Sequence, residues 1–252
     1  MTRPAVLITG AAKRIGAELA RAFGHDGWHV IIHYGSSAAE AEALAEELPS
    51  AEAIHCDLAD SDAAVAMVAS LAARLPDWRA LINSASMFRY DDAAQLDRMI
   101  FNRSMVINAK TPARMAQTYL AHAKAPNGRR VIHVTDQKLE NSNPDFFSYT
   151  MSKHALNATI EMLRDKGSRP DDRIYGLAPG LTLPSHDQTD DEFACAASMN
   201  LLQRNTAPEE IGRAAVFLTS GHLASGQTLF VDSGQHLLNH RRDVMYLIRE
   251  QQ

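Results

Sequence analysis

The chain has 252 residues, of which 46% are hydrophobic and 22% are charged, and its formal net charge is −5. This composition is typical of a globular domain with a sizeable core and argues against disorder. The negative charge provides no basic field for nucleic acid or an anionic membrane, so we expect neither as a partner. The two cysteines, Cys56 and Cys195, follow no metal-binding or redox spacing. We therefore expect a cytoplasmic protein without a metal site, and the apolar run Pro4–Ile8 is too short for a membrane segment.

Short β-rich runs alternate along the chain with longer stretches whose apolar residues recur every three or four positions. This order predicts an α/β Rossmann fold in a single domain over residues 1–252, with a doubly wound parallel sheet of about seven strands and helices on both faces. The predicted strands are Ala5–Thr9, His29–His33, Ala53–His55, Ala80–Asn83, Arg130–Thr135, Arg173–Leu177 and Thr228–Val231. The predicted helices are Arg14–Gly24, Ala38–Leu48, Asp62–Leu75, Asp97–Ala123, Ser148–Lys166 and Pro208–Ser220. In such folds, ligands bind at the loops that follow the strands.

A glycine-containing loop, Thr9–Gly16, follows the first strand and leads into a helix. Its glycines permit a tight turn and a close backbone approach, and they leave free N–H groups at a helix N-terminus to face a pyrophosphate. A dinucleotide site is predicted here. A purely structural turn remains the alternative, since many strand-to-helix corners carry glycine.

The end of the second predicted strand indicates which dinucleotide binds. An NAD site usually places a carboxylate there, but this chain has no acid between His33 and Ser37. Arg14, with Lys13 beside it, would supply positive charge for a 2′-phosphate, and Ser36 or Ser37 would donate hydrogen bonds. We therefore predict NADPH as the cofactor. The alternative is that Lys13 and Arg14 are solvated residues at the start of the helix and bind no phosphate.

Tyr149 and Lys153 are one helical turn apart and would project from one face of the predicted helix. A phenol has a pKa of about 10, and a nearby ammonium favours its ionised form, which would ease proton donation during reduction. Tyr149 is the predicted acid, and Lys153 would also hold the nicotinamide ribose. Taken alone, this spacing arises by chance in many helices.

Taken together, the motifs resemble those of the short-chain dehydrogenase/reductase family in the same order over nearly the whole chain. The resemblance implies that Asp57 meets the adenine, that Asn83 packs beside the cofactor and that Asn108 holds a water in a proton relay with Lys153. It also implies a homotetramer built partly through the helix of Tyr149. Structural readings remain for Asn108, as a helix cap or kink, and for Asp57, as a turn residue. The implied cofactor-binding residues are Gly10, Arg14, Ile15, Gly16, His33, Tyr34, Ser36, Asp57, Leu58, Asn83, Ala85, Lys153, Pro179 and Gly180.

Asp136 stands where most members of this family have a serine. A serine hydroxyl can donate a hydrogen bond to a ketone oxygen, whereas a carboxylate only accepts and would repel a developing alkoxide. Asp136 therefore suits a substrate with N–H donors, such as a pterin. The predicted catalytic residues are Asp136, Tyr149, Lys153 and Asn108.

Several stretches, including residues 9–14, 33–34, 37–41 and 83–88, are similar to the pteridine and dihydromonapterin reductases. This resemblance implies that Phe88 stacks on the pterin and that Ser86 contacts the cofactor or the pterin. The implied substrate-binding residues are Ser86, Phe88, Asp136 and Tyr149. An aromatic residue after a strand is more often part of a core, which is the alternative for Phe88.

The chain departs from the pteridine reductases in three places. Ser36 replaces a residue that is often basic. A predicted substrate lid over residues 181–203 is individual to this chain and includes His186, Asp187, Phe193 and Met199. In a C-terminal extension over residues 237–252, Val244, Leu247 and Ile248 would form an apolar helix stripe that covers a neighbouring subunit or the site; the alternative is a frayed tail.

The leading functional hypothesis is NADPH-dependent reduction of dihydromonapterin, dihydrobiopterin or dihydrofolate to the tetrahydro form. The alternative is a generic short-chain reductase of ketones, 3-oxoacyl groups or quinones. A non-catalytic NADP-binding sensor is less favoured, because such proteins usually lose the tyrosine or the lysine.

Overall fold

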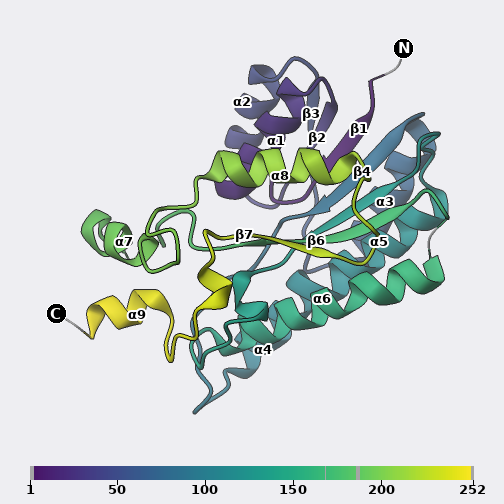
Figure 1. The fold of residues 1–252 in the computed structure, drawn as a ribbon. Helices are drawn as coiled ribbons and strands as arrows, with labels where there is room; N and C mark the ends of the chain where they lie inside the picture. Colours follow the sequence, from purple (N-terminus) through teal and green to yellow (C-terminus); the bar gives the residue numbers. More distant parts are fainter. Residues whose placement is uncertain (1–2, 168, 186–187, 251–252) are drawn as a thin grey trace.

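Seven parallel strands form one sheet in the computed structural model, which describes residues 3–167, 169–185 and 188–250 (Figure 1). The order is β3-β2-β1-β4-β5-β6-β7, so it reverses between β1 and β4. This confirms the predicted doubly wound sheet. Its strands are β1 (Ala5–Ile8), β2 (His29–Tyr34), β3 (Ala51–His55), β4 (Trp78–Asn83), β5 (Arg130–Val134), β6 (Arg173–Pro179) and β7 (Thr228–Val231).

Helices cover both faces of the sheet because successive strand residues point to opposite sides. Val6 and Ile8 belong to the core beneath α1 (Arg14–His25), α2 (Ala38–Glu47) and α8 (Pro208–Thr219). Leu7 and Leu81 belong to the core beneath α3 (Ser61–Arg74), α5 (Thr111–His122) and α6 (Phe147–Gly167). Figure 1 shows these two helix layers on either side of the strands.

The helix predicted over Asp97–Ala123 is broken, which corrects the sequence reading. Asp97 lies outside as the N-cap of α4 (Arg98–Met105), accepting hydrogen bonds from the N–H groups of Met99 and Ile100. A π-helical turn, Val106–Lys110, then joins α4 to α5. Pro112 has no N–H to offer the carbonyl of Asn108 four residues earlier, which loosens the α-helical ladder at this point.

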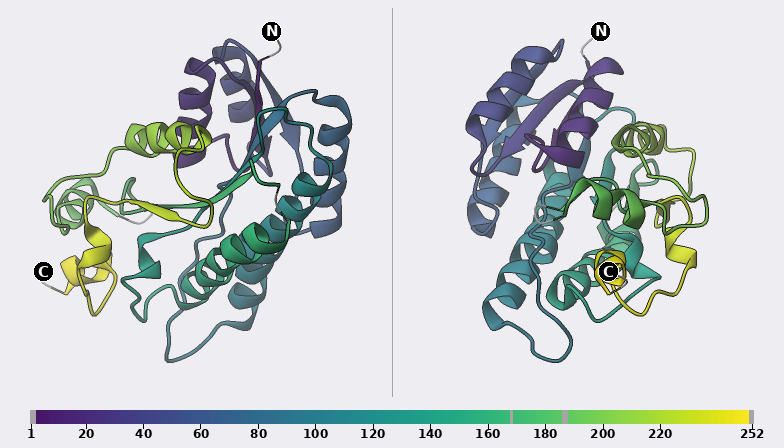
Figure 2. Two further views of the ribbon diagram at one scale, coloured as in Figure 1. Left: turned by 45° about the vertical axis from the view of Figure 1, so that its right-hand side comes forward. Right: turned by 90° about the vertical axis from the view of Figure 1, so that its left-hand side faces the viewer.

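Three short helices were not predicted from the sequence, because each has few turns and little periodicity. They are the 3₁₀ turns Gln137–Leu139 and Gln235–Leu237 and the helix α7 (Asp190–Ala197). Helix α9 (Val244–Arg249) lies where an apolar helix stripe was expected in the C-terminal extension. Helices α7 and α9 contact each other beyond the carboxyl ends of the strands, away from the N-terminus (Figure 2). Within the described ranges, no helix is both long and apolar enough to cross a membrane.

Candidate active site

The predicted site residues gather at the carboxyl edge of the sheet because all seven strands are parallel and end on that side. The glycine loop follows β1, Asn83 ends β4, Asp136 follows β5 and Gly180 follows β6. Helix α6 brings Tyr149 and Lys153 to the same edge.

The glycine loop after β1 is held in a narrow space. Gly10 has a φ of +66°, and a Cβ there would lie 2.9 Å from the Cα of Ala85. A Cβ on Gly16 would overlap the carbonyl oxygen of Gly10. Both positions therefore require glycine, and the loop packs directly on the segment after β4.

His33 and Thr9 fasten this loop to neighbouring strands. The Nδ1 of His33 accepts from the N–H of Gly10 at 3.1 Å, and its Nε2 lies 3.0 Å from the carbonyl of Cys56. Burial lowers the pKa of His33 to about 4, so the ring is neutral and donates from Nε2. Thr9 Oγ1 accepts from the N–H groups of Ser84 and Ala85. Both ring nitrogens of His33 are thus used by the protein, and its role in the cofactor site is to shape the loop.

Lys13 and Arg14, the two cations of the glycine loop, contact different parts of the protein. Lys13 pairs with Glu40 of α2 at 2.7 Å, beside the exposed Ser36 at the end of β2. Arg14 has a φ of +55°, and its guanidinium donates to the carbonyl of Pro184 at 2.9 Å. In this arrangement Lys13 contacts α2, the helix that follows β2, whereas Arg14 contacts the predicted lid.

The remaining predicted cofactor residues differ in how deeply they are buried. Ile15 and Tyr34 are partly buried against the core beneath α1 and α8. Asp57 is exposed and accepts from the N–H of Ala59 at 2.9 Å, so it does begin a turn. The others follow the strands as predicted: Leu58, Asn83 and Pro179 are buried, and Ala85 and Gly180 are partly buried.

Tyr149 and Asp136 form a hydrogen-bonded pair. The hydroxyl of Tyr149 donates to Oδ2 of Asp136 at 2.6 Å, and Oδ1 of Asp136 accepts from the N–H of Lys138 at 2.9 Å. Burial raises the pKa of Asp136. Burial, together with the neighbouring Asp136 carboxylate, also raises the pKa of Tyr149 well above its ordinary value. Burial and Asp136 therefore outweigh the expected lowering of the Tyr149 pKa by Lys153 in this arrangement, and the pair holds its proton at neutral pH.

Lys153 lies close to the Tyr149 ring of the pair formed by Tyr149 and Asp136. Its Nζ donates to the carbonyl of Val134 at 2.7 Å and is 5.5 Å from the centre of the Tyr149 ring. Burial lowers the pKa of Lys153 to about 8, against a raising effect of Asp136. The fully buried His133 lies behind it, with its pKa lowered to about 3 by burial and by Lys153. Nδ1 of His133 accepts from the amide of Asn83 at 3.1 Å. This hydrogen bond connects β5, which leads to Asp136, with the end of β4.

Asn108 lies in the π-helical turn and is fully buried. Its Oδ1 accepts from the N–H of Met87 at 2.7 Å, and its Nδ2 donates to the carbonyl of Met87 and to Oγ of Ser152, each at 2.9 Å. Asn108 thereby fixes Met87, the residue between Ser86 and Phe88. Its predicted part in a water relay with Lys153 stays a prediction.

Phe88 lies at the edge of the Tyr149 ring. The two ring centres are 4.7 Å apart and perpendicular, and Phe146 stacks on Phe88 at 4.0 Å. Phe88 is 44% exposed, so it presents apolar area that the core does not cover. Ser86, two residues earlier, is also exposed.

The predicted lid and extension meet each other. Phe193 of α7 and Met199 after it are partly buried, while His186 and Asp187 lie outside the described residues. Arg249 of α9 pairs with Glu192 of α7 at 2.8 Å. The C-terminal extension is docked over the described residues 237–250 and is not a frayed tail.

The buried stripe of the extension also differs from the prediction. Val244 and Met245 are the fully buried residues of α9, whereas Leu247 and Ile248 are only partly buried.

Sequence reasoning missed the residues that support the site from behind. Lys138 contacts the ring of Phe146, and Arg242 pairs with Asp145, in the segment that leads into Tyr149. Arg242 lies 97 positions from Asp145, and a single sequence carries no signal of that contact. In the described part of the chain, no group of three or more His, Cys, Asp or Glu residues is placed to bind a metal ion.

Comparisons with known proteins give one family and two kinds of relative. Residues 10–236 match the family model described as enoyl-(acyl carrier protein) reductase. The chain is 32% identical to the FolM alternative dihydrofolate reductase 1 of Brucella canis, solved with NADP, with a TM-score of 0.87 over 95% of this chain and 96% of that one. It is 25% identical to a dihydromonapterin reductase of Klebsiella pneumoniae over 92% of this chain and 96% of that protein. It is 24% identical to a granaticin polyketide synthase putative ketoacyl reductase of Streptomyces violaceoruber over 93% and 97%.

Proposed function

Because the chain belongs to the short-chain dehydrogenase/reductase family, we propose that it reduces a dihydropterin to the tetrahydro form with NADPH. The observation that carries this proposal is the 2.6 Å hydrogen bond between Tyr149 and Asp136, with Phe88 at the edge of the Tyr149 ring. The pair offers a proton and a hydrogen-bond acceptor to a nitrogen-rich ring, and Phe88 offers a stacking surface.

The residues around the glycine loop fit NADPH. The crowded contacts of Gly10 and Gly16 leave room only for backbone, whose N–H groups suit a pyrophosphate at the start of α1. Lys13 and Ser36 supply a cation and a hydroxyl near the end of β2, where residues 33–37 include no carboxylate, and Arg14 supplies a second cation from the glycine loop. When bound, NADPH supplies the hydride.

Tyr149 donates the proton, and Asp136 reprotonates Tyr149. Reduction of a C=N bond places a hydride on carbon and requires one proton on nitrogen. Tyr149 remains protonated at neutral pH and gives that proton to the ring nitrogen. Asp136, whose pKa is raised and whose side chain is partly exposed, accepts a proton from water and returns it to Tyr149. The buried Lys153 ammonium stabilises the negative charge that Tyr149 carries in between.

Substrate recognition follows from the acceptor character of Asp136. An ionised carboxylate binds N–H donors such as those of the pyrimidine ring of a pterin, and it disfavours the alkoxide that ketone reduction generates. The alignment with the FolM and dihydromonapterin reductases supports this substrate class.

Ketone or 3-oxoacyl reduction is the second candidate. The similarity to the granaticin ketoacyl reductase favours it, as does the presence of Tyr149 and Lys153, which would serve a ketone equally well. A homotetramer and a cytoplasmic location remain predictions.

The test is NADPH oxidation with dihydromonapterin, dihydrobiopterin and dihydrofolate beside ketones, 3-oxoacyl thioesters and quinones. We expect at least one dihydropterin to exceed every carbonyl compound in kcat/KM by about tenfold or more. Rapid turnover of carbonyl compounds with none of any pterin would overturn the proposal.

A further inference from the structure

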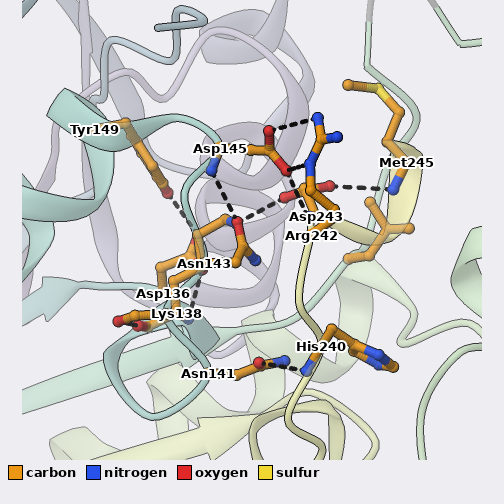
Figure 3. Close-up of polar contacts among 12 residues, drawn as sticks. Asp136, Lys138, Asn141, Asn143, Asp145, Tyr149, His240, Arg242, Asp243 and Met245 are labelled. Carbon is orange, nitrogen blue, oxygen red and sulfur yellow. Dashed lines mark hydrogen bonds and ion pairs between the residues drawn. The ribbon is translucent and has the colours of Figure 1, made fainter. Parts of the chain in front are cut away.

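The C-terminal segment 239–250 lies against the catalytic segment 136–149 of the same chain (Figure 3). We infer that this segment forms the closed end of the substrate site and limits the size of the substituent on the reduced ring. The inference rests on the proposed pterin reduction, because it names which pterins the site accepts.

Ionic contacts anchor the segment at Asp145. Arg242 donates to both carboxylate oxygens of Asp145, from Nε and from Nη2, each at 2.8 Å. The N–H of Asp243 donates to Asp145 at 2.9 Å. The Asp145 side chain is only 2% exposed and that of Arg242 is 32% exposed, so the carboxylate is shielded from water while the guanidinium is partly solvated. The bidentate geometry fixes the orientation of the two side chains. Figure 3 shows Arg242 and Asp145 pointing toward each other across the two segments.

A second anchor lies two residues after Asp136. Lys138 Nζ contacts Oδ2 of Asp243 at 2.7 Å and donates to Oδ1 of Asn143 at 3.1 Å. The N–H of Lys138 is also the donor that holds Oδ1 of Asp136. The extension therefore contacts the same residue whose backbone orients the catalytic carboxylate.

Apolar contacts reach the catalytic tyrosine. Met245 is 4% exposed and forms one buried cluster with Phe146 and Tyr149, with Tyr246 packed against it. The Tyr246 ring is 5.3 Å from Tyr90 and 6.1 Å from Phe146. Met245 thus occupies space beside Tyr149 that a larger substrate would need.

Phe146 explains why the anchors are required. Its φ of +55° is unusual for a bulky residue, and such a strained conformation persists only where the surrounding structure holds it. The Asp145 anchor fixes the residue immediately before it, and Met245 packs on its ring. Phe146 in turn stacks on Phe88, the residue that we assign to the pterin.

The extension also reaches the predicted lid. Arg249 of α9 pairs with Glu192, whose carboxylate closes the capping box that begins α7. One short helix therefore contacts both the lid and the segment with Tyr149. A substituent leaving the ring on this side meets Met245 and Tyr246, so the site should favour pterins with short side chains over folates with their long aminobenzoylglutamate group.

The size limit is tested with Met245→Ala. We expect kcat/KM for dihydrofolate to rise about tenfold relative to that for dihydrobiopterin or dihydromonapterin, because removing a few methylenes changes discrimination by about this much. Val244→Ala, at the buried neighbour outside the Tyr149 cluster, is the matched control and should leave the ratio unchanged. An unchanged ratio in Met245→Ala, or an equal change in both variants, would overturn the size limit.

The anchor is tested with Arg242→Ala against Arg241→Ala. Arg241 is 81% exposed and pairs with Glu250, so it controls for loss of a neighbouring cation. Arg242→Ala should raise KM for the pterin about tenfold while KM for NADPH stays within about twofold, since misplacing Phe146 disturbs one side of the site. Arg242→Lys should recover part of the loss, because lysine keeps the charge without the fork. Equal effects of Arg241→Ala and Arg242→Ala would contradict the anchor.

Hydrogen exchange separates this inference from the proposed function. If the wild-type protein reduces no pterin, the proposed function fails. The anchor is still decided by amide exchange of residues 145–149 and 189–197, which should quicken about tenfold in Arg242→Ala and not in Arg241→Ala. Unchanged exchange in Arg242→Ala would overturn the inference whatever the substrate.

Discussion

The cofactor side and the substrate side of this site are built in different ways. The cofactor side consists of backbone and small residues from β1–α1 and β2–α2, held by contacts such as Gly10 on Ala85 and His33 on Gly10. The substrate side consists of side chains from separate segments, and Arg242 contacts Asp145 across 97 positions in the chain. A site formed by crowded backbone and small residues tolerates few substitutions, whereas side-chain contacts can be changed by one substitution at a time. Substrate preference can therefore vary on a constant cofactor frame.

Tyr149→Phe should have the largest effect and should spare the cofactor side. Removing the hydroxyl eliminates the proton donor, and we expect kcat to fall by about 10³-fold, within the range of general acid catalysis. NADPH affinity, measured by fluorescence titration, should stay within about twofold, because the phenyl ring keeps its contact with Phe88. Retained turnover would remove Tyr149 from the mechanism.

Lys13→Ala should weaken NADPH binding on the cofactor side. If Lys13 meets the 2′-phosphate, its loss should raise KM for NADPH about tenfold and leave KM for NADH unchanged. Arg14→Ala is the comparison, because Arg14 contacts Pro184 on the substrate side of the loop. Steady-state kinetics with NADPH and NADH shows which of the two cations meets the 2′-phosphate. A larger loss of NADPH selectivity in Arg14→Ala than in Lys13→Ala would assign the 2′-phosphate to Arg14, as predicted from the sequence.

Asn108→Ala should act mainly on the substrate side. It removes three hydrogen bonds and leaves the N–H and carbonyl of Met87 without this partner, at a cost of about 1–3 kcal/mol in unfolding free energy. Because Met87 precedes Phe88, KM for the pterin should rise more than KM for NADPH. Denaturant unfolding and steady-state kinetics test this, with Asn157→Ala, which removes an amide contact with Thr228, as the control.

The pH dependence should give the smallest effect. The pKa of Lys153 is lowered to about 8, so its ammonium is present below that pH and is lost as the pH rises through it. We expect kcat/KM to fall to about half near pH 8 and to continue falling above it. In Lys153→Arg, whose guanidinium does not titrate in this range, the falling limb should disappear. A limb that persists in that variant would assign it to another group.

The sequence predicted the sheet and the position of the glycine loop because those features depend on local pattern. The alternation of elements, the glycine loop and the Tyr149–Lys153 spacing each lie within one stretch of chain. It did not predict the π-helical turn at Asn108, where a missing N–H at Pro112 meets tertiary contacts. Nor did it place Phe146 beside Phe88 or predict the raised pKa of Tyr149, because burial and the Asp136 contact appear only after folding.

Asp136→Ser tests the central claim most directly, since it gives the site the residue that most family members have. The measurement is the ratio of kcat/KM for a dihydropterin to that for a ketone, in the wild type and the variant, with NADPH affinity as the control. The account predicts that the ratio falls about 100-fold while NADPH affinity is retained, because the acceptor for ring N–H groups is lost and a donor is gained. An unchanged ratio would contradict it.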